Sequence, residues 1–164
     1  MLKSLDWNND TAISFVDNLI LFSGHLSSKK EKNIDQIKKM LTSLQKVRKI
    51  YPSHHLIVVC DVNNFLKTVP PFLNVYPDKE NIPTTLKKRT YLQPQVNKAN
   101  EVAQQCRDHL ITDLELKNRK VLGITGESSN NIGYLPCEKH PYDHFLVTAT
   151  IEIEENQKWF ELKY

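Results

Sequence analysis

Two polar side chains follow an apolar run in the first half of the chain, and they are the first candidates for chemistry. Asp61 and Asn63 come directly after Leu56–Cys60, a run of apolar residues without alternation. Their spacing places both side chains on the same side of an extended segment. A carboxylate there can attract a metal ion or a water proton, and an amide can donate to a phosphate oxygen. Taken alone the pair also fits a turn, so the other motifs have to decide.

Histidines and further carboxylates stand beside other apolar runs. His25 follows Leu19–Phe22, Asp108 precedes Leu110-Ile111, and Asp143-His144 precede a final apolar segment. Imidazole titrates near neutrality and suits proton transfer, whereas carboxylates suit hard cations. Each residue singly also fits a structural, turn or capping role. Because all of them flank apolar runs, the sequence indicates polar groups gathered at strand ends.

Apolar periodicity predicts the elements that position these residues. Ser28-Lys29-Lys30-Glu31 has the form of a capping box, and apolar residues then recur at spacings of three and four. This pattern predicts a helix over Ser28–Tyr51. The unbroken run Leu56–Cys60, rich in β-branched residues, is typical of an interior strand covered on both faces. Strand, helix and strand in this order predict a crossover with parallel strands.

The remaining segments are predicted to be short strands, turns and loops. Ala12–Val16 and Leu19–Phe22 flank Asp17-Asn18, which favours a two-residue hairpin, although a helix across these residues is an alternative. Phe65–Pro94 is rich in proline and predicts a long surface loop, with disorder as the alternative. Val96–Cys106 is polar with weak helical spacing. Further strands are expected at Asp108–Ile111, Val121–Ile124 and Phe145–Ile153.

Composition is that of one ordinary globular domain. Of 164 residues, 40% are hydrophobic and 25% charged, and the net charge of +3 permits an anionic substrate without requiring one. The three cysteines are widely spaced and contain no CxxC, which favours reduced structural thiols over a disulfide framework or a zinc site. No signal peptide and no apolar run long enough for a membrane span is present, so an intracellular, soluble protein is expected.

The order of the motifs resembles the C-terminal half of the endonuclease/exonuclease/phosphatase superfamily. The resemblance runs from Ala12 to Ile153, and its most specific part is Leu-Pro-Cys-Glu-Lys-His-Pro-Tyr-Asp-His, ending at His144. The superfamily commonly has Ser where Tyr142 stands and Gly-Asp-Phe-Asn where Cys60–Asn63 stand. The resemblance implies an α/β fold, part of a four-layer sandwich of two packed mixed β-sheets flanked by helices. Residues 1–164 would form a single, partial domain that lacks the N-terminal half.

The same resemblance implies a role for each polar residue. His144 would activate the attacking water or contact the phosphate, and Asp108 would hold its tautomer. Asp61 would sit beside the nucleophilic water, Asn63 would donate to a non-bridging phosphate oxygen, and His25 would stabilise charge on the phosphate. The metal ligand would be Asp143, and the implied cofactor is Mg²⁺ or Mn²⁺.

The superfamily's glutamate metal ligand belongs to the N-terminal half, and neither Glu31 nor Glu80 occupies its position. We therefore expect the isolated chain to have little or no activity. Two readings stay open: a Mg²⁺-dependent phosphoester hydrolase or its C-terminal half, and a catalytically inactive derivative that acts in binding or assembly. Another chain or an N-terminal segment would complete the fold.

The class of phosphoester substrate is not decided by these residues. A nucleic acid, a phospholipid and an inositol phosphate all remain open, because members of the superfamily share catalytic residues and differ in loops. We expect the loop Phe65–Val96, with Thr84, Thr85 and Lys87-Lys88-Arg89, to set specificity.

Overall fold

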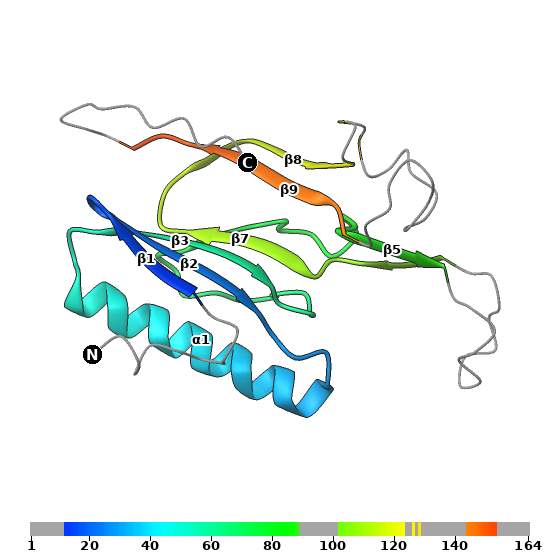
Figure 1. The fold of residues 1–164 in the computed structure, drawn as a ribbon, viewed down its shortest axis with the longest axis horizontal. Helices are drawn as coiled ribbons and strands as arrows, with labels where there is room; N and C mark the ends of the chain where they lie inside the picture. The colour runs from blue at the N-terminus through cyan, green and yellow to red at the C-terminus, as the bar shows by residue number, and fades with distance from the viewer. Residues whose placement is uncertain (1–11, 89–101, 124–125, 127, 129–143, 154–164) are drawn as a thin grey trace.

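The chain forms a mixed main sheet, a helix on one side of it and a strand pair on the other (Figure 1). The computed structural model describes residues 12–88, 102–123, 126, 128 and 144–153. The main sheet has the order β1-β2-β3-β7-β4. Its strands are β1 (Ala12–Val16), β2 (Leu19–His25), β3 (His55–Asp61), β4 (Asn74–Tyr76) and β7 (Asp108–Thr112).

The predicted hairpin and crossover are both confirmed. β1 pairs antiparallel with β2 through the turn at Asp17, whose φ of 49° suits the left-handed conformation that a tight hairpin turn requires. β2 then pairs parallel with β3, and α1 (Lys30–Ile50) connects them. Because the two strands are parallel and in register, His25 lies opposite Asp61 at the same edge of the sheet.

Helix α1 is confirmed, but its predicted capping box does not form. The N-cap residue is Lys29 and makes no side-chain capping bond. Instead, Ser27 Oγ accepts from the Lys29 N–H at 3.2 Å, and Gln36 Oε1 accepts from the Ser27 N–H at 2.7 Å. The helix therefore starts later than Ser28, because the preceding loop is bonded to the buried side of the helix.

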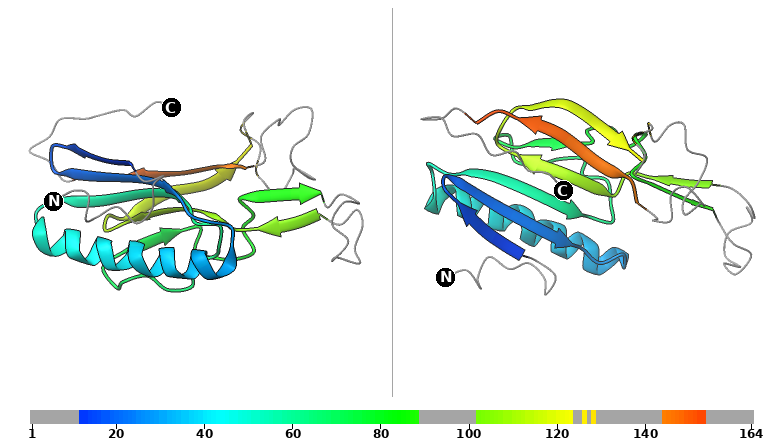
Figure 2. Two further views of the ribbon diagram at one scale, coloured as in Figure 1. Left: turned by 60° about the horizontal axis from the view of Figure 1, so that its bottom comes forward. Right: turned by 45° about the horizontal axis from the view of Figure 1, so that its top comes forward.

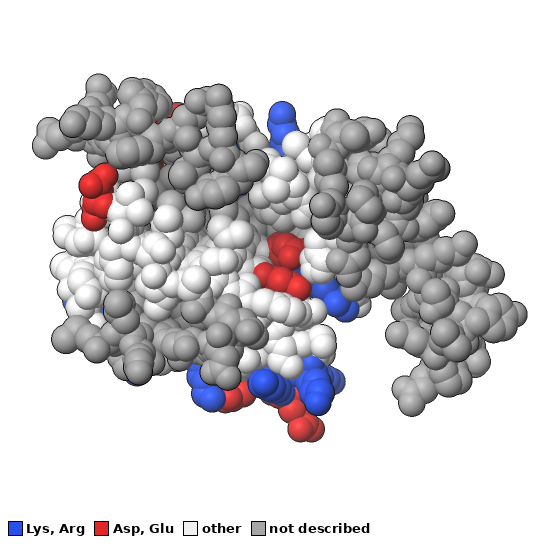
Figure 3. Space-filling view, in the orientation of Figure 1, with Lys and Arg blue, Asp and Glu red and all other residues white. Residues whose placement is uncertain are grey.

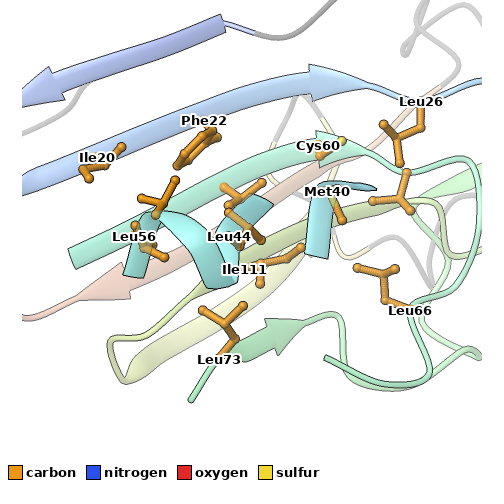
Figure 4. Close-up of a cluster of buried hydrophobic side chains, with 13 residues drawn as sticks. Ile20, Phe22, Leu26, Met40, Leu44, Leu56, Cys60, Leu66, Leu73 and Ile111 are labelled. Carbon is orange, nitrogen blue, oxygen red and sulfur yellow. The ribbon is translucent and has the colours of Figure 1, made fainter. Parts of the chain in front are cut away.

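The main core lies between α1 and one face of the sheet (Figure 4). Met40, Leu44 and Val47 from the helix are fully buried, as are Leu56 and Val58 from β3. Burial of a large apolar side chain stabilises a fold by about 1.5–3 kcal/mol, so this layer fixes the position of β3.

The expectation that β3 is covered on both faces is wrong. β3 is an interior strand between β2 and β7, as predicted. However, successive side chains of a strand point to opposite faces, and only one of these faces meets α1. Val59, on the other face, is 53% exposed.

The second sheet consists of β8 (Leu116–Leu122) and β9 (Leu146–Ile151), which pair antiparallel. It lies on the side of the main sheet opposite α1, as Figure 2 shows from two further directions. A small core of Tyr76, Val121 and Phe145 anchors it. Of the predicted strand Val121–Ile124, Val121 and Leu122 lie in β8, which begins earlier than expected, and Ile124 lies outside the described residues. β9 confirms the strand predicted within Phe145–Ile153.

The segment Phe65–Pro94 is not one long loop. It contains β4 and also β5 (Thr85–Lys88), which pairs with β6 (Val102–Gln105). In the stretch Val96–Cys106, where the sequence suggested weak helical spacing, residues 102–105 form β6 and residues 96–101 lie outside the described part of the chain. The prolines precede or follow these short strands, whose partners lie far away in sequence. No helix in the part of the chain that the structure describes is both long and apolar enough to cross a membrane.

Candidate active site

The pairing of three strands brings the polar motifs to one edge of the main sheet. His25 ends β2, Asp61 ends β3, and Asp108 begins β7, which is antiparallel to β3. The register sets Asp61 opposite both His25 and Asp108. His144 comes from the residues just before β9. The structure therefore brings together His25, Asp61, Asn63, Asp108 and His144, whereas Asp143, the expected metal ligand, lies outside the described residues.

His144 and Asp108 form the shortest side-chain contact of the site. Nδ1 of His144 lies 2.8 Å from Oδ2 and 3.0 Å from Oδ1 of Asp108. A carboxylate can only accept, so Nδ1 carries the proton when the Asp108 carboxyl group is ionised. The other ring nitrogen, Nε2, then faces Oδ2 of Asp61 at 3.9 Å. The arrangement holds one tautomer of the imidazole and directs Nε2 toward the second carboxylate.

Thr84 fixes the backbone behind this pair. Its Oγ1 accepts from the N–H groups of Arg107 at 2.8 Å and Asp108 at 3.0 Å, and its carbonyl accepts from Phe145 N–H at 2.8 Å. Thr84 is completely buried. Our expectation that Thr84 sets substrate specificity is therefore not supported by its position, because its side chain is bonded within the protein and turned away from solvent.

The carboxylate of Asp61 lies in an environment that disfavours its negative charge. Burial raises the pKa of this carboxyl group, and the nearby Asp108 raises it further. Three neighbours oppose this rise in pKa: the Asn63 N–H, which donates to Oδ1 at 2.8 Å, and the rings of His144 and His25. Oδ2 lies 3.4 Å from Nε2 of His25. Asp61 is thus a site where positive charge or a proton is favourable.

Asn63 occupies a left-handed backbone position, with a φ of 52°, directly after the strand. Its Nδ2 lies 2.8 Å from the Leu26 carbonyl and 2.9 Å from Nε2 of His25. Its Oδ1 accepts from Nη1 of Arg107 at 3.0 Å. Arg107 was not among the residues that the sequence singled out for chemistry, although its position beside Asp108 is a signal that could have identified it.

Buried polar side chains of α1 hold the two loops that carry the site. Nδ2 of Asn33 donates to the carbonyls of Ser27 at 2.9 Å and Val62 at 2.7 Å. Nδ2 of Asn64 donates to Oδ1 of Asn33 at 3.1 Å. Asn33 is only 2% exposed, so losing it would leave buried carbonyls without partners, which costs about 1–3 kcal/mol per group. The helix that the crossover requires thereby also fixes the loops after β2 and β3.

The donor set is compatible with a divalent cation. Ligand atoms of Asp61, Asp108 and His144 lie within 4.8 Å of one another. Mg²⁺ is usually bound by one or two carboxylates together with waters and substrate phosphates, and this set supplies two carboxylates. Asp61 fits this role best, because Asp108 already accepts from His144. A cation there would also relieve the repulsion that raises the pKa of Asp61.

A cleft of about 310 Å³ adjoins the site between the main sheet and β9. Its polar end includes Asp61 and Asp108, and its apolar walls include Val59, Leu110 and Leu146. Figure 3 shows acidic side chains in a recess near the middle of this face, with a basic side chain beside them. The catalytic candidates are therefore accessible from solvent, in keeping with the 31% exposure of the His144 side chain.

Among the comparisons with known proteins, the comparison with solved structures finds proteins similar to this chain. No family model matches it, and no curated protein matches it in sequence. Truncated TDP2 from Caenorhabditis elegans superposes with a TM-score of 0.56 at 16% identity, over 86% of this chain and 58% of that one. TDP2 from D. rerio, complexed with a single-strand DNA product, gives 0.55 at 16% identity, over 87% of this chain and 60% of that one.

The endonuclease domain of TRAS1, a telomere-specific non-LTR retrotransposon, superposes with a TM-score of 0.52 at 15% identity. That match covers 90% of this chain and 66% of that domain. The chain thus spans less than two thirds of the length of each of these structures. At these identities the likeness shows a shared fold, and it confirms the expected α/β arrangement with a mixed sheet and a second sheet.

Proposed function

We propose that this chain, which has the fold of the endonuclease/exonuclease/phosphatase superfamily, is the part of a metal-dependent phosphoester hydrolase that holds its water-activating groups. One observation carries the proposal. The His144 ring lies between two carboxylates, with Nδ1 bonded to Asp108 and Nε2 facing Asp61 at 3.9 Å. A ring held in this way presents Nε2 toward Asp61 at the polar end of the cleft, where an imidazole can act as a general base.

The chemistry of the described residues suits attack of water on phosphorus. A water between Nε2 of His144 and Oδ2 of Asp61 would be within hydrogen-bonding distance of both, because these atoms are 3.9 Å apart. His144 would take its proton as the water attacks, and Asp108 would stabilise the resulting imidazolium. By the resemblance, His25 would stabilise charge on the phosphate from its place beside Asp61, where its Nε2 lies 3.4 Å from Oδ2.

Asp61, and Asp143 by the resemblance, are the residues that would hold the metal ion. When bound, Mg²⁺ neutralises charge on the phosphate oxygens, which lowers the barrier to attack by an oxygen nucleophile. The protein's own contribution is to orient the Asp61 carboxylate and to offset part of the rise in its pKa that burial causes. The Asn63 N–H does this by donating to Oδ1, which leaves Oδ2 on the open side.

We assign the substrate to nucleic acid rather than to phospholipid or inositol phosphate. The support comes from the structures that share the fold, one of which holds a single-strand DNA product while another is an endonuclease domain. These two likenesses favour a nucleic acid over the other two substrate classes. The net charge of +3 is compatible with a polyanionic substrate.

The test is single-turnover cleavage with the purified chain in excess over fluorescent single-stranded DNA or RNA. We expect slow cleavage that needs Mg²⁺ and is absent in excess chelator. His144→Ala should lower the rate by at least about 100-fold, the usual contribution of a general base. The matched control is His55→Ala, which removes a histidine at the opposite end of β3.

A catalytically inactive derivative that acts in binding or assembly is the competing function. It is favoured by one observation: within the described residues, the group of ligand atoms contains Asp61, Asp108 and His144 but no glutamate. Tight binding of single-stranded DNA without any cleavage, even with the chain in excess, would establish this alternative. Rapid multiple turnover by the chain alone would instead overturn our expectation of low activity.

A further inference from the structure

The side-chain amide of Asn63 spends both of its N–H groups on the protein itself. A primary amide has two N–H bonds and one carbonyl oxygen. Nδ2 contacts the Leu26 carbonyl at 2.8 Å and Nε2 of His25 at 2.9 Å, and Oδ1 contacts Nη1 of Arg107 at 3.0 Å. When Nε2 of His25 is unprotonated and accepts from Nδ2, both N–H groups of Asn63 are bonded to the protein, and none is left for a phosphate oxygen.

The orientation of the amide is fixed by the chemistry of its neighbours. A carbonyl can only accept and a guanidinium can only donate. Exchanging Oδ1 and Nδ2 would therefore set two acceptors against each other at Leu26 and two donors against each other at Arg107. Leu26 is itself held in place, because its N–H donates to the Asp61 carbonyl at 2.8 Å. Arg107 and Leu26 together determine which way Asn63 points.

Arg107 has the donors that Asn63 lacks. A guanidinium group carries five N–H bonds in a planar fork. Among the described residues, its bond to Asn63 Oδ1 is the one hydrogen bond that the fork makes, and it forms no ion pair with a described carboxylate. Its backbone is bonded on both sides: the N–H donates to Thr84 Oγ1 and the carbonyl accepts from Val62 N–H, each at 2.8 Å. The base of the side chain is thus rigid while most of its fork stays open.

We propose that Arg107 binds the phosphate group of the substrate through these remaining N–H groups, and that Asn63 serves to hold the guanidinium in place. The inference rests on the proposed function and deepens it by naming the phosphate ligand. A planar fork matches the oxygens of a phosphate better than a single amide donor does. It also supplies a permanent positive charge where Asp61 and Asp108 would otherwise repel the substrate.

The experiment measures phosphate binding by NMR titration in metal-free buffer, where no cleavage takes place. The probes are thymidine 5′-phosphate, glycerol phosphate and unphosphorylated thymidine. The first two probes share the phosphate group. The one that binds with higher affinity shows whether the phosphate belongs to a nucleotide or a lipid headgroup. We expect both phosphates to shift the backbone amides of Asp61 and Asn63, and thymidine to shift neither.

Arg107→Gln should weaken phosphate binding by about tenfold or more, the usual value of a charge-assisted hydrogen bond. Arg107→Lys keeps the charge but loses the fork, and should weaken binding by a few-fold. The control Lys39→Gln removes one positive charge from the surface of α1, where Lys39 pairs with Asp35, and should leave phosphate affinity unchanged.

Unchanged phosphate affinity in folded Arg107→Gln would overturn the inference, even if its melting temperature fell, because a purely structural role affects stability and not affinity. If Arg107→Gln does not fold, Arg107→Lys decides, and affinity equal to that of the wild type overturns the inference. Failure of the wild-type chain to bind either phosphate would also overturn the inference. Phosphate binding that depends on Arg107 without any cleavage would refute the hydrolase but not this inference.

Discussion

The antiparallel pair of β3 and β7 has a histidine–aspartate contact at each end, and the two contacts differ in what surrounds them. At one end, Nδ1 of His144 lies 2.8 Å from Oδ2 of Asp108. At the other end, Nδ1 of His55 lies 3.2 Å from Oδ2 of Asp113. The two pairs share the same ring nitrogen and the same kind of acceptor, so the contact itself does not distinguish a candidate site from a structural one.

At the Asp113 end, protein groups satisfy the charge and the hydrogen bonds of the carboxylate. Oδ1 of Asp113 accepts from the Leu56 N–H at 2.7 Å, and Oδ2 accepts from Nη1 of Arg48 at 3.1 Å as well as facing His55. The Asp113 side chain is only 5% exposed. One carboxylate therefore joins α1, β3 and the end of β7, with an arginine to balance its charge. Such a group stabilises the fold and has little capacity for a ligand.

At the Asp108 end, the negative charge of the carboxylates is less well balanced. Two carboxylates, Asp61 and Asp108, face each other, and the pKa of Asp61 is raised by burial and by this repulsion. Within the described residues, no arginine or lysine forms an ion pair with either of them. Unbalanced negative charge, and not a histidine–aspartate pair, therefore marks the end of β3 where a cation and a substrate would bind.

The largest expected effect separates the two histidines by activity. His144→Ala should reduce Mg²⁺-dependent cleavage by at least about 100-fold, since it removes the group placed to accept the proton from water. His55→Ala should leave the rate of the folded protein within a few-fold of the wild type. Single-turnover rates of both variants, with circular dichroism spectra as the folding check, make the measurement. Equal losses of cleavage rate in the two variants would show that the two histidine–aspartate pairs do not differ in function.

The next effect separates the two aspartates by stability. Asp113→Ala should lower the free energy of unfolding by about 2–3 kcal/mol, because it leaves the Leu56 N–H unsatisfied and Arg48 without its partner. Asp113→Asn, which keeps an acceptor for Leu56, should cost less. Urea unfolding curves provide the values. A loss from Asp113→Ala no greater than that from an exposed control such as Asp35→Ala would show that this end does not stabilise the fold.

A smaller effect of opposite sign is expected at Asp61. Asp61→Asn removes the repulsion with Asp108 while keeping an oxygen for the Asn63 N–H, so it should raise the free energy of unfolding by about 1 kcal/mol or less. The same variant should lose Mg²⁺-dependent cleavage. Urea unfolding in chelator measures the stability change without interference from bound metal. A clear decrease in stability would mean that Asp61 is as well balanced as Asp113.

The smallest effect concerns the thiols near the acidic end. Burial, followed by Asp61 and Asp108, raises the pKa of Cys60 to about 12, and burial together with Asp108 and Glu80 raises that of Cys106 to about 12. In a Cys137→Ser background, a thiol reagent at mildly alkaline pH should therefore label neither cysteine in the folded chain, while both react in denaturant.

Adding Asp61→Asn to that background should slightly increase the reactivity of Cys60. Cys106 is the internal control, because Asp61 is not among the causes of its shift. The measurement is the labelling rate of each cysteine, separated by mass spectrometry of peptides. Rapid labelling of Cys60 in the folded parent would contradict the burial on which the raised pKa depends.

Elements with local signals were predictable from the amino-acid sequence. Apolar spacings of three and four specify α1, the unbroken run Leu56–Cys60 specifies β3, and Asp17-Asn18 specifies the turn between β1 and β2. The placement of Asp61 and His25 at strand ends follows from these elements and from the parallel crossover that joins them. Their catalytic roles stay predictions, as does the role of Asp143.

The covered faces of the strands and the contacts between distant polar atoms depend on how the elements pack in three dimensions. The face of β3 that leaves Val59 exposed depends on the position of α1, and the burial of Thr84 depends on β7 and Phe145. The bond between Arg107 and Asn63 joins residues 44 positions apart, and that between His144 and Asp108 joins residues 36 apart. Local periodicity reports only on neighbours within a few residues, so contacts at such separations become visible once the strands are paired.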